Sequence, residues 1–299
     1  MAALVREDHR GLSGLDVEVR LGDVRDADSL RRAFRDAEVV YHCAGYVSIA
    51  ADDWPRLLAI NVEGTRHVVE ACRANGVRRL VHFSSIEALV DTPLDLPVDE
   101  GRPLVGQPKV SPYARSKAAG EAIVRQAIAQ DLDAIILNPT AMIGPHDYRR
   151  SYSNAGLLVM CGGRLPALVE GGFNWVDVRD VASGAICAEE QAPAGRRYIL
   201  GGHGASVQDL AMLAHEINGA RVPGLVCPMW LARLAAPLVT AWCAVTGGRA
   251  LLTSAGLRPL RGNQHISHAL AERELGYRPR PLRDTVADTL RWFEEHDPT

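Results

Sequence analysis

The chain has 299 residues, of which 47% are hydrophobic and 23% charged, and its formal net charge is −3. This composition predicts an ordinary globular protein with enough apolar material for a core. The small negative charge gives no electrostatic reason to expect nucleic acid as a partner. The first residues hold too short an apolar stretch for a signal peptide, and we expect a cytoplasmic protein.

The six cysteines are scattered along the chain, without a Cys-x-x-Cys pair and without ligand spacing to histidine. We interpret them as reduced thiols and expect no structural metal. The longest apolar run, 234–246, is shorter than a membrane span and contains Pro237. We interpret it as a buried or substrate-facing helix, with contact to a membrane surface as the less favoured alternative.

Strands and helices alternate through the first half of the chain. Residues 4–6 resemble the end of a strand, and the alternating residues 17–21 predict the next one. The remaining elements are expected at 28–37 (helix), 38–43 (buried strand), 53–75 (long helix closed by Gly76), and in strands ending at Phe83 and Leu137. This alternation up to about residue 145 predicts an α/β fold with a doubly wound parallel sheet.

The second half is mostly helical. Helices are expected at 151–163, 178–190, 207–218 and 282–296, with extended pieces at 165–170 and 197–200. We therefore expect a Rossmann-type dinucleotide-binding domain over 1–145, to which 174–203 returns. Residues 146–173 and 204–299 are expected to form a smaller, mostly helical substrate-binding part.

The chain is organised around Tyr113-Ala-Arg-Ser-Lys117, which follows Pro112 at the expected start of a helix. On a helix Tyr113 and Lys117 lie one turn apart on one face. A neighbouring ammonium favours the phenolate and lowers the pKa of a tyrosine, which then exchanges a proton with an alcohol or ketone near neutral pH. The plain alternative is a surface tyrosine and a surface lysine on an amphipathic helix.

Two apolar runs flank this helix, Arg79-Leu-Val-His-Phe-Ser-Ser-Ile-Glu87 and Asp133-Ala-Ile-Ile-Leu-Asn-Pro-Thr140. Together they form a βαβ pattern with polar residues at the strand ends. With these motifs the sequence resembles the extended, epimerase-like branch of the short-chain dehydrogenase/reductase superfamily, nearest to its dihydroflavonol-reductase-like and 3β-hydroxysteroid-dehydrogenase-like group. The resemblance implies a catalytic triad of Ser85, Tyr113 and Lys117, with Ile86 and Glu87 also at the substrate.

The same resemblance implies a set of cofactor contacts, to which Tyr113 and Lys117 also belong. Arg6 ends the second strand of the family, where an arginine accommodates the 2′-phosphate of NADP; we therefore prefer NADP(H), with NAD(H) as the alternative. Asn61 is expected to brace the active-site helix, and His42 to be packed. The other implied contacts are Asp23, Val24, Cys43, Ala44, Gly45, Asn138, Pro139 and Thr140.

The glycine-rich turn that opens a Rossmann fold does not occur near the first residue. In the family, residues 4–6 correspond to the second strand. We therefore expect a strand, a glycine-rich turn and a helix to be encoded upstream in the reading frame. Without them we expect weak binding of dinucleotide and two neighbouring strands that lack a partner.

Three functions remain open. The first is a carbonyl reductase or alcohol dehydrogenase, and the second a nucleotide-sugar epimerase with the same triad. Dehydration is disfavoured, because Ile86 stands where dehydratases of this branch carry an acid. The third is a non-catalytic dinucleotide-fold protein.

The substrate region is expected from 86–107, 145–164 and the helices after 228, which favour a small, apolar molecule. Family members often pair through helices equivalent to 54–75 and 113–130, so a homodimer is possible.

Overall fold

The structure is a computed structural model that describes residues 1–48, 53–106, 110–161, 165, 167–246, 257 and 259–296. The strands are β1 (Ala2–Val5), β2 (Glu18–Leu21), β3 (Val39–His42), β4 (Arg79–Phe83), β5 (Ala134–Pro139), β6 (Ala141–Ile143), β7 (Leu168–Val169), β8 (Gly172–Asp177), β9 (Arg197–Leu200), β10 (His203–Ser206) and β11 (Val226–Cys227). The α-helices are α1 (Ala27–Ala33), α2 (Trp54–Leu57), α3 (Gly64–Ala74), α4 (Pro112–Ile128), α5 (Tyr152–Cys161), α6 (Val178–Gln191), α7 (Val207–Asn218), α8 (Met229–Thr246), α9 (Ala269–Leu275) and α10 (Leu282–His296).

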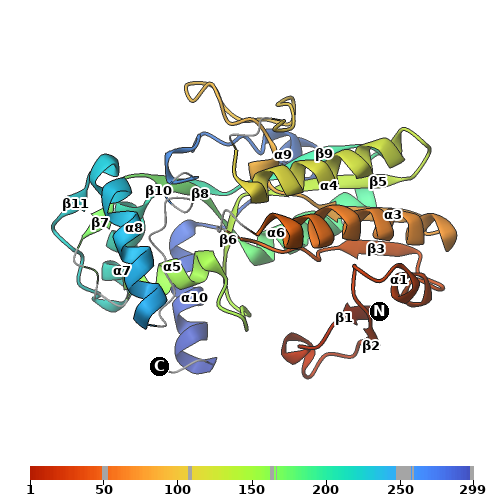
Figure 1. Cartoon of the computed structure of the whole chain (residues 1–299), viewed down its shortest axis with the longest axis horizontal. Coiled ribbons are helices and arrows are strands. Elements are labelled where there is room, and N and C mark those ends of the chain that lie inside the picture. The colour runs from red at the N-terminus through yellow and green to blue at the C-terminus, as the bar shows by residue number, and fades with distance from the viewer. Residues whose placement is uncertain are drawn as a thin grey trace.

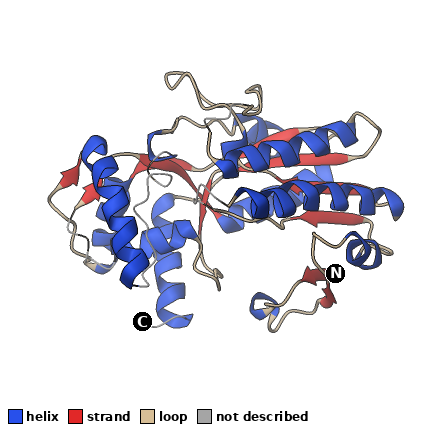
Figure 2. Ribbon diagram, in the orientation of Figure 1, coloured by secondary structure: helices blue, strands red, loops and turns tan. Residues whose placement is uncertain are grey.

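A four-stranded parallel sheet in the order β3-β4-β5-β9 forms the centre of the first part of the molecule. Its strands are joined by helices, as a parallel sheet requires. Figure 2 shows the helices in blue along the red strands. The predicted α/β fold of Rossmann type is confirmed, and the parallel strands bring their carboxyl ends to one edge.

Helices cover both faces of this sheet, because alternate residues of each strand point in opposite directions. Leu80 and Ile136 pack on one face with α3 and α4, through Val68, Cys72 and Val124. The alternate strand residues pack on the other face with α6 and α9; this second core includes Val81, Ile135, Leu137, Val181, Ala185, Tyr198, Ala271 and Leu275. The near-continuous apolar strands that the sequence contains are explained by this burial on two sides.

Strands β1 and β2 form a separate parallel pair, with Val5 opposite Leu21. Among the described strands β1 pairs only with β2, and β3 only with β4. Figure 1 shows the pair near α1, below β3. Leu4 nevertheless packs against the core beneath α3, so the pair is attached to the sheet domain through side chains.

The long helix expected at 53–75 is divided in the structure. Between α2 and α3 the chain forms one wide π-helical segment, η2 (Leu58–Glu63), before it returns to an α-helix at Gly64. Such π segments occur where a helix must present particular groups at a functional site. Here the wide turn contains Asn61, which contacts the helix that carries Tyr113.

The second part of the molecule, to the left in Figure 1, is built on a three-stranded sheet in the order β10-β8-β6. Its core lies between this sheet and α5, α7 and α10, through Leu157, Leu210 and Leu290. Within the run 234–246, which we interpreted as a buried or substrate-facing helix, Leu234 is exposed and Ala236 is buried, and most of the later side chains lie outside the described residues. None of the described helices is both long and apolar enough to cross a membrane.

Candidate active site

The candidate site lies at the carboxyl edge of the central sheet. Strand β4 ends directly before Ser84 and Ser85, β5 before Thr140, and β3 before Cys43. In open parallel sheets ligands bind at this edge, where the connecting loops diverge. The structure therefore brings residues from distant parts of the chain to one place.

Helix α4 places Tyr113 and Lys117 over this edge. The Ser111 side chain accepts a hydrogen bond from the Ala114 N–H and caps the helix, and Pro112 occupies the first turn. Gly120 lets the helix approach the η2 segment, because a Cβ at this position would lie 2.5 Å from the backbone oxygen of Asn61. The predicted helix is confirmed, and a close contact fixes its position.

Ser85 and Tyr113 come close at the strand end, where the Ser85 side chain lies near enough to influence the pKa of the Tyr113 phenol. Ser85 also accepts a hydrogen bond from the Glu87 N–H at 3.2 Å, which opens the short helix η3 (Ile86–Ala88). Burial raises the pKa of Tyr113 above its ordinary value, the negative charge of Glu87 raises it further, and the nearby Ser85 hydroxyl opposes both. The expected lowering of this pKa by Lys117 is wrong for this structure, because loss of water around the phenol is the larger effect.

Lys117 is 9% exposed and donates a hydrogen bond of 2.7 Å to the backbone oxygen of Phe83. Burial lowers the pKa of Lys117 to about 8, while Glu121 and Cys43 favour the charged form. The ammonium also lies near Gly45, since a Cβ on that glycine would be 3.7 Å from Nζ. Lys117 thus occupies the space between the ends of β3 and β4.

Asn61 braces α4, as expected from the sequence. Its Nδ2 donates to the Tyr46 backbone oxygen and to the Ser116 hydroxyl, each at 2.9 Å, and its Oδ1 accepts from the Tyr46 N–H at 2.7 Å. His42 is buried as expected, and its Nε2 lies 3.0 Å from the Thr65 hydroxyl. These bonds connect η2, the loop after β3 and α4.

Two further residues, Glu121 and Arg197, support the site and were not singled out in the sequence. Glu121 is fully buried on α4 and pairs with Arg197 of β9 at 3.0 Å. Asn138 Nδ2 donates both to Glu121 Oε2 and to the Ser85 backbone oxygen, each at 2.9 Å. The only indication in the sequence that Glu121 supports the site is its spacing, since it lies one helical turn after Lys117 on the same helix.

The remaining predicted contacts are divided between the separate β1–β2 pair, which Arg6, Asp23 and Val24 follow, and the ends of β4 and β5. Arg6 follows β1, is 3.7 Å from Glu7 and contributes to lowering the pKa of Asp23, whose main cause is the hydrogen bond from Arg25. Val24 is buried against Gly64, so its side chain serves the core. Pro139 lies in β5 opposite Leu200. Ile86 packs against an apolar cluster that includes Leu89 and Val98.

The residues present fit a dinucleotide at this edge. The exposed backbone of Cys43, Ala44 and Gly45 has small side chains that let a flat molecule approach Lys117. At the end of β5, Asn138 Oδ1 and the Thr140 hydroxyl are buried and have no hydrogen-bond partner among the described residues.

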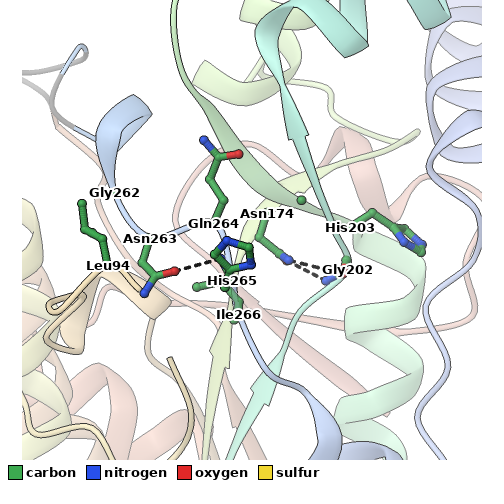
Figure 3. A pocket seen from close by; sticks show the side chains of 10 residues that line it. Leu94, Asn174, Gly202, His203, Gly262, Asn263, Gln264, His265 and Ile266 are labelled. Atoms are coloured by element: carbon green, nitrogen blue, oxygen red, sulfur yellow. Dashed lines mark hydrogen bonds between the residues drawn. The ribbon is translucent and has the colours of Figure 1, made fainter. Parts of the chain in front are cut away.

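A separate polar hollow of about 740 Å³ lies beside β8 and β10 (Figure 3). Asn174 supports its floor by hydrogen bonds to the backbone of Gly202, and Asn263 accepts from the His265 N–H at 2.8 Å. Its described lining contains Leu94 from the expected substrate region but neither Ser85, Tyr113 nor Lys117. The hollow is therefore distinct from the candidate active site.

A model of the NAD dependent epimerase/dehydratase family matches residues 2–201. The chain belongs to this family. It is 33% identical to sterol demethylase protein B of Methylococcus capsulatus over 97% of this chain and 89% of that protein. A putative dihydroflavonol 4-reductase of Synechocystis is 29% identical, over 98% and 87% of the two chains. The crystal structure of gox2253 superimposes with a TM-score of 0.85 at 32% identity, covering 98% of this chain and 90% of that one.

The family assignment confirms the resemblance seen in the sequence. The relatives include proteins named for the same two groups, dihydroflavonol reductases and 3β-hydroxysteroid dehydrogenases. Epimerases also occur among them, with a UDP-glucose 4-epimerase of Mycolicibacterium smegmatis matching 60% of this chain. Membership therefore shows the fold and the family but leaves the individual activity and substrate open.

Proposed function

We propose that this member of the NAD dependent epimerase/dehydratase family is an oxidoreductase that interconverts a carbonyl and an alcohol on a small, apolar substrate. The observation that carries the proposal is the placement of Ser85 after β4 beside Tyr113 of α4, one helical turn from a buried Lys117 that donates a hydrogen bond to the end of the same strand. Three groups of these types, gathered at a ligand-binding edge, can hold and protonate a carbonyl oxygen.

Each side chain has a defined task in this mechanism. Ser85 holds the substrate oxygen, and Tyr113 donates a proton to it during reduction or removes one during oxidation. Lys117 binds the ribose next to the nicotinamide and supplies positive charge near the phenol. The bound dinucleotide supplies the hydride, while the protein positions the reacting groups. The raised pKa keeps Tyr113 protonated at neutral pH but makes it a weaker acid than an ordinary phenol, so proton donation in carbonyl reduction relies on the positive charge that Lys117 supplies.

The preferred cofactor is NADP(H), with NAD(H) as the alternative. Arg6 follows β1 at the position where a cation meets the 2′-phosphate of NADP, and no carboxylate precedes it in that strand. Arg6 is 45% exposed at its side chain, so a phosphate can reach it. The nearby Glu7 lies 3.7 Å away and competes for the same guanidinium.

A nucleotide-sugar epimerase is the second candidate, because epimerases occur among the relatives. The packing of Ile86 argues against a dehydratase, since this side chain belongs to an apolar cluster with Leu89, Val98 and Ile199 and has no proton to donate. A reductase and an epimerase differ in net redox change, so consumption of NADPH with an apolar ketone distinguishes them.

The test is a fluorescence titration with NADPH, followed by NADPH oxidation with a panel of apolar ketones and aldehydes. Tyr113→Phe should lower the rate by about 10²–10⁴-fold, the usual contribution of acid–base catalysis, while leaving cofactor affinity within a few-fold. Tyr41→Phe is the matched control, because Tyr41 is exposed on β3. A rate above about a tenth of the original in Tyr113→Phe would reject the mechanism. Absence of both binding and turnover would favour a non-catalytic protein.

A further inference from the structure

The outward face of α8 carries larger apolar side chains than its buried face. Trp230 and Leu234 are 65% and 67% exposed, and Leu231 is 43% exposed. The buried face consists of Met229, Ala232 and Ala236. A surface helix of a globular protein normally has the opposite arrangement, with large apolar residues toward the core.

The large apolar side chains exposed on this helix form one surface, which we call the α8 patch: Trp230, Leu231 and Leu234. Positions 230, 231 and 234 share a helical face, and Leu225, 64% exposed, directly precedes β11 at the start of the same segment. Figure 1 shows α8 at the end of the molecule away from α4, which carries Tyr113. Exposed apolar patches of this kind mark interaction surfaces, and this one is separate from the candidate active site.

The charge of this region is equally distinctive. Residues 217–271 contain five arginines and neither aspartate, glutamate nor lysine, although the whole chain has 36 acidic residues. Arg233 is exposed on α8 itself, and Arg221 and Arg261 are exposed in the segments before and after it. The full charges of 217–271 at neutral pH are therefore all positive, and the Glu170 carboxylate lies at the start of α8, where it accepts a hydrogen bond of 3.1 Å from the Met229 N–H.

We propose that the α8 patch docks on an anionic lipid bilayer. Trp230 and the leucines would enter the boundary between headgroups and acyl chains, where tryptophan is enriched, and the arginines would contact the lipid phosphates. A second copy of this chain fits less well. A symmetric contact would place two arginine-bearing surfaces against each other, with no carboxylate from 217–271 to pair with them.

The test is co-sedimentation of the full chain with phosphatidylcholine vesicles that contain or lack phosphatidylglycerol. Binding should be at least about tenfold stronger to the anionic vesicles and should weaken as salt rises. Trp230→Ser combined with Leu234→Ser should lower the affinity by about tenfold or more. Arg233→Gln should lower it by about fivefold, the effect of one basic residue near such a surface. Ile186→Ser on α6 and Arg35→Gln after α1, both exposed, should have no effect.

A second measurement keeps the result independent of folding. Brominated lipids should quench part of the tryptophan fluorescence of the native chain, and Trp230→Phe, which keeps the surface apolar, should remove that part. Equal binding to neutral vesicles, binding without quenching at Trp230, or no binding at all would overturn the proposal. So would a soluble dimer that Trp230→Ser dissociates, because the patch would then be an interface between copies.

Discussion

The Lys117 ammonium donates a hydrogen bond of 2.7 Å to the backbone oxygen of Phe83, the last residue of β4. This bond ties the catalytic helix to the strand that presents Ser85, and it holds the lysine in a largely dry environment. Burial there lowers the pKa of Lys117 to about 8. The ammonium is therefore both a positioned charge and a source of pH-dependent stability.

The first prediction follows from that pKa. Below about pH 8 the folded and unfolded chains both carry the ammonium, so the cost of burying it is fully present. Between this value and about pH 10.4, where the unfolded lysine titrates, the unfolded chain binds more protons and the folded state gains stability with rising pH.

Lys117→Met lacks this dependence. We expect the unfolding free energy of the native chain, measured by urea denaturation, to rise between about pH 8 and about pH 10.4. Relative to Lys117→Met, the rise should be on the order of a few kcal/mol. Parallel pH curves for the two proteins would contradict the assignment. Glu121→Gln, which removes a charge that favours the ammonium, should move the onset of the rise to lower pH.

The second prediction concerns the buried ion pair between Glu121 and Arg197. Arg197→Met leaves the Glu121 carboxylate without its partner at 3.0 Å in a fully buried position. Loss of one partner of such a pair typically costs about 3–5 kcal/mol of unfolding free energy. Glu190→Gln, which changes an exposed carboxylate on α6, should cost less than about 0.5 kcal/mol.

Because Asn138 connects Glu121 to the backbone of Ser85, the same pair also positions the candidate active site. Asn138→Leu should lower kcat more than it changes the affinity for NADPH. A purely structural role would instead lower stability with kcat unchanged in the folded fraction. Measurement of kcat, cofactor affinity and urea stability on one protein sample separates the two.

The third prediction uses the close approach of α4 to η2. A Cβ on Gly120 would lie 2.5 Å from the Asn61 backbone oxygen, so Gly120→Ala must displace the helix that carries Tyr113. Overpacking of this kind typically costs about 1–3 kcal/mol. Gly156→Ala on α5 is the matched control, since a Cβ there meets nothing within 4 Å. Equal stability and equal activity of the two variants would show that the contact does not position α4.

Part of this site was predictable from the sequence, for physical reasons. Parallel strands bring their carboxyl ends to one edge, so Ser85 was expected at a ligand-binding edge, and the family resemblance implied that it lies with Tyr113. Spacing along a helix placed Lys117 beside Tyr113. The family motif also gave the bracing role of Asn61, which its bond to Ser116 confirms.

Other features depend on tertiary packing and could not be predicted. The π-helical segment η2 has the same apolar spacing as the α-helix expected there. Glu121 and Arg197 are far apart in sequence, so their pairing follows only from the order of the strands. Because the apolar run in α8 is nearly continuous, the sequence did not show which side chains face the core, and in the structure Leu234 is exposed while Ala236 is buried. The raised pKa of Tyr113 likewise reflects the loss of water around it, which sequence spacing does not reveal.

The last prediction tests the cofactor preference through Arg6. If its guanidinium binds the 2′-phosphate, Arg6→Ala removes a charge-assisted hydrogen bond worth roughly 1.5–3 kcal/mol, or about tenfold or more in affinity for NADPH. The affinity for NADH should change little, because NADH lacks that phosphate. Arg32→Ala, an exposed arginine on α1, should leave both affinities unchanged. Fluorescence titration with both cofactors gives the ratio directly. An equal loss for NADPH and NADH would mean that Arg6 does not read the phosphate, and that the preference for NADP is wrong.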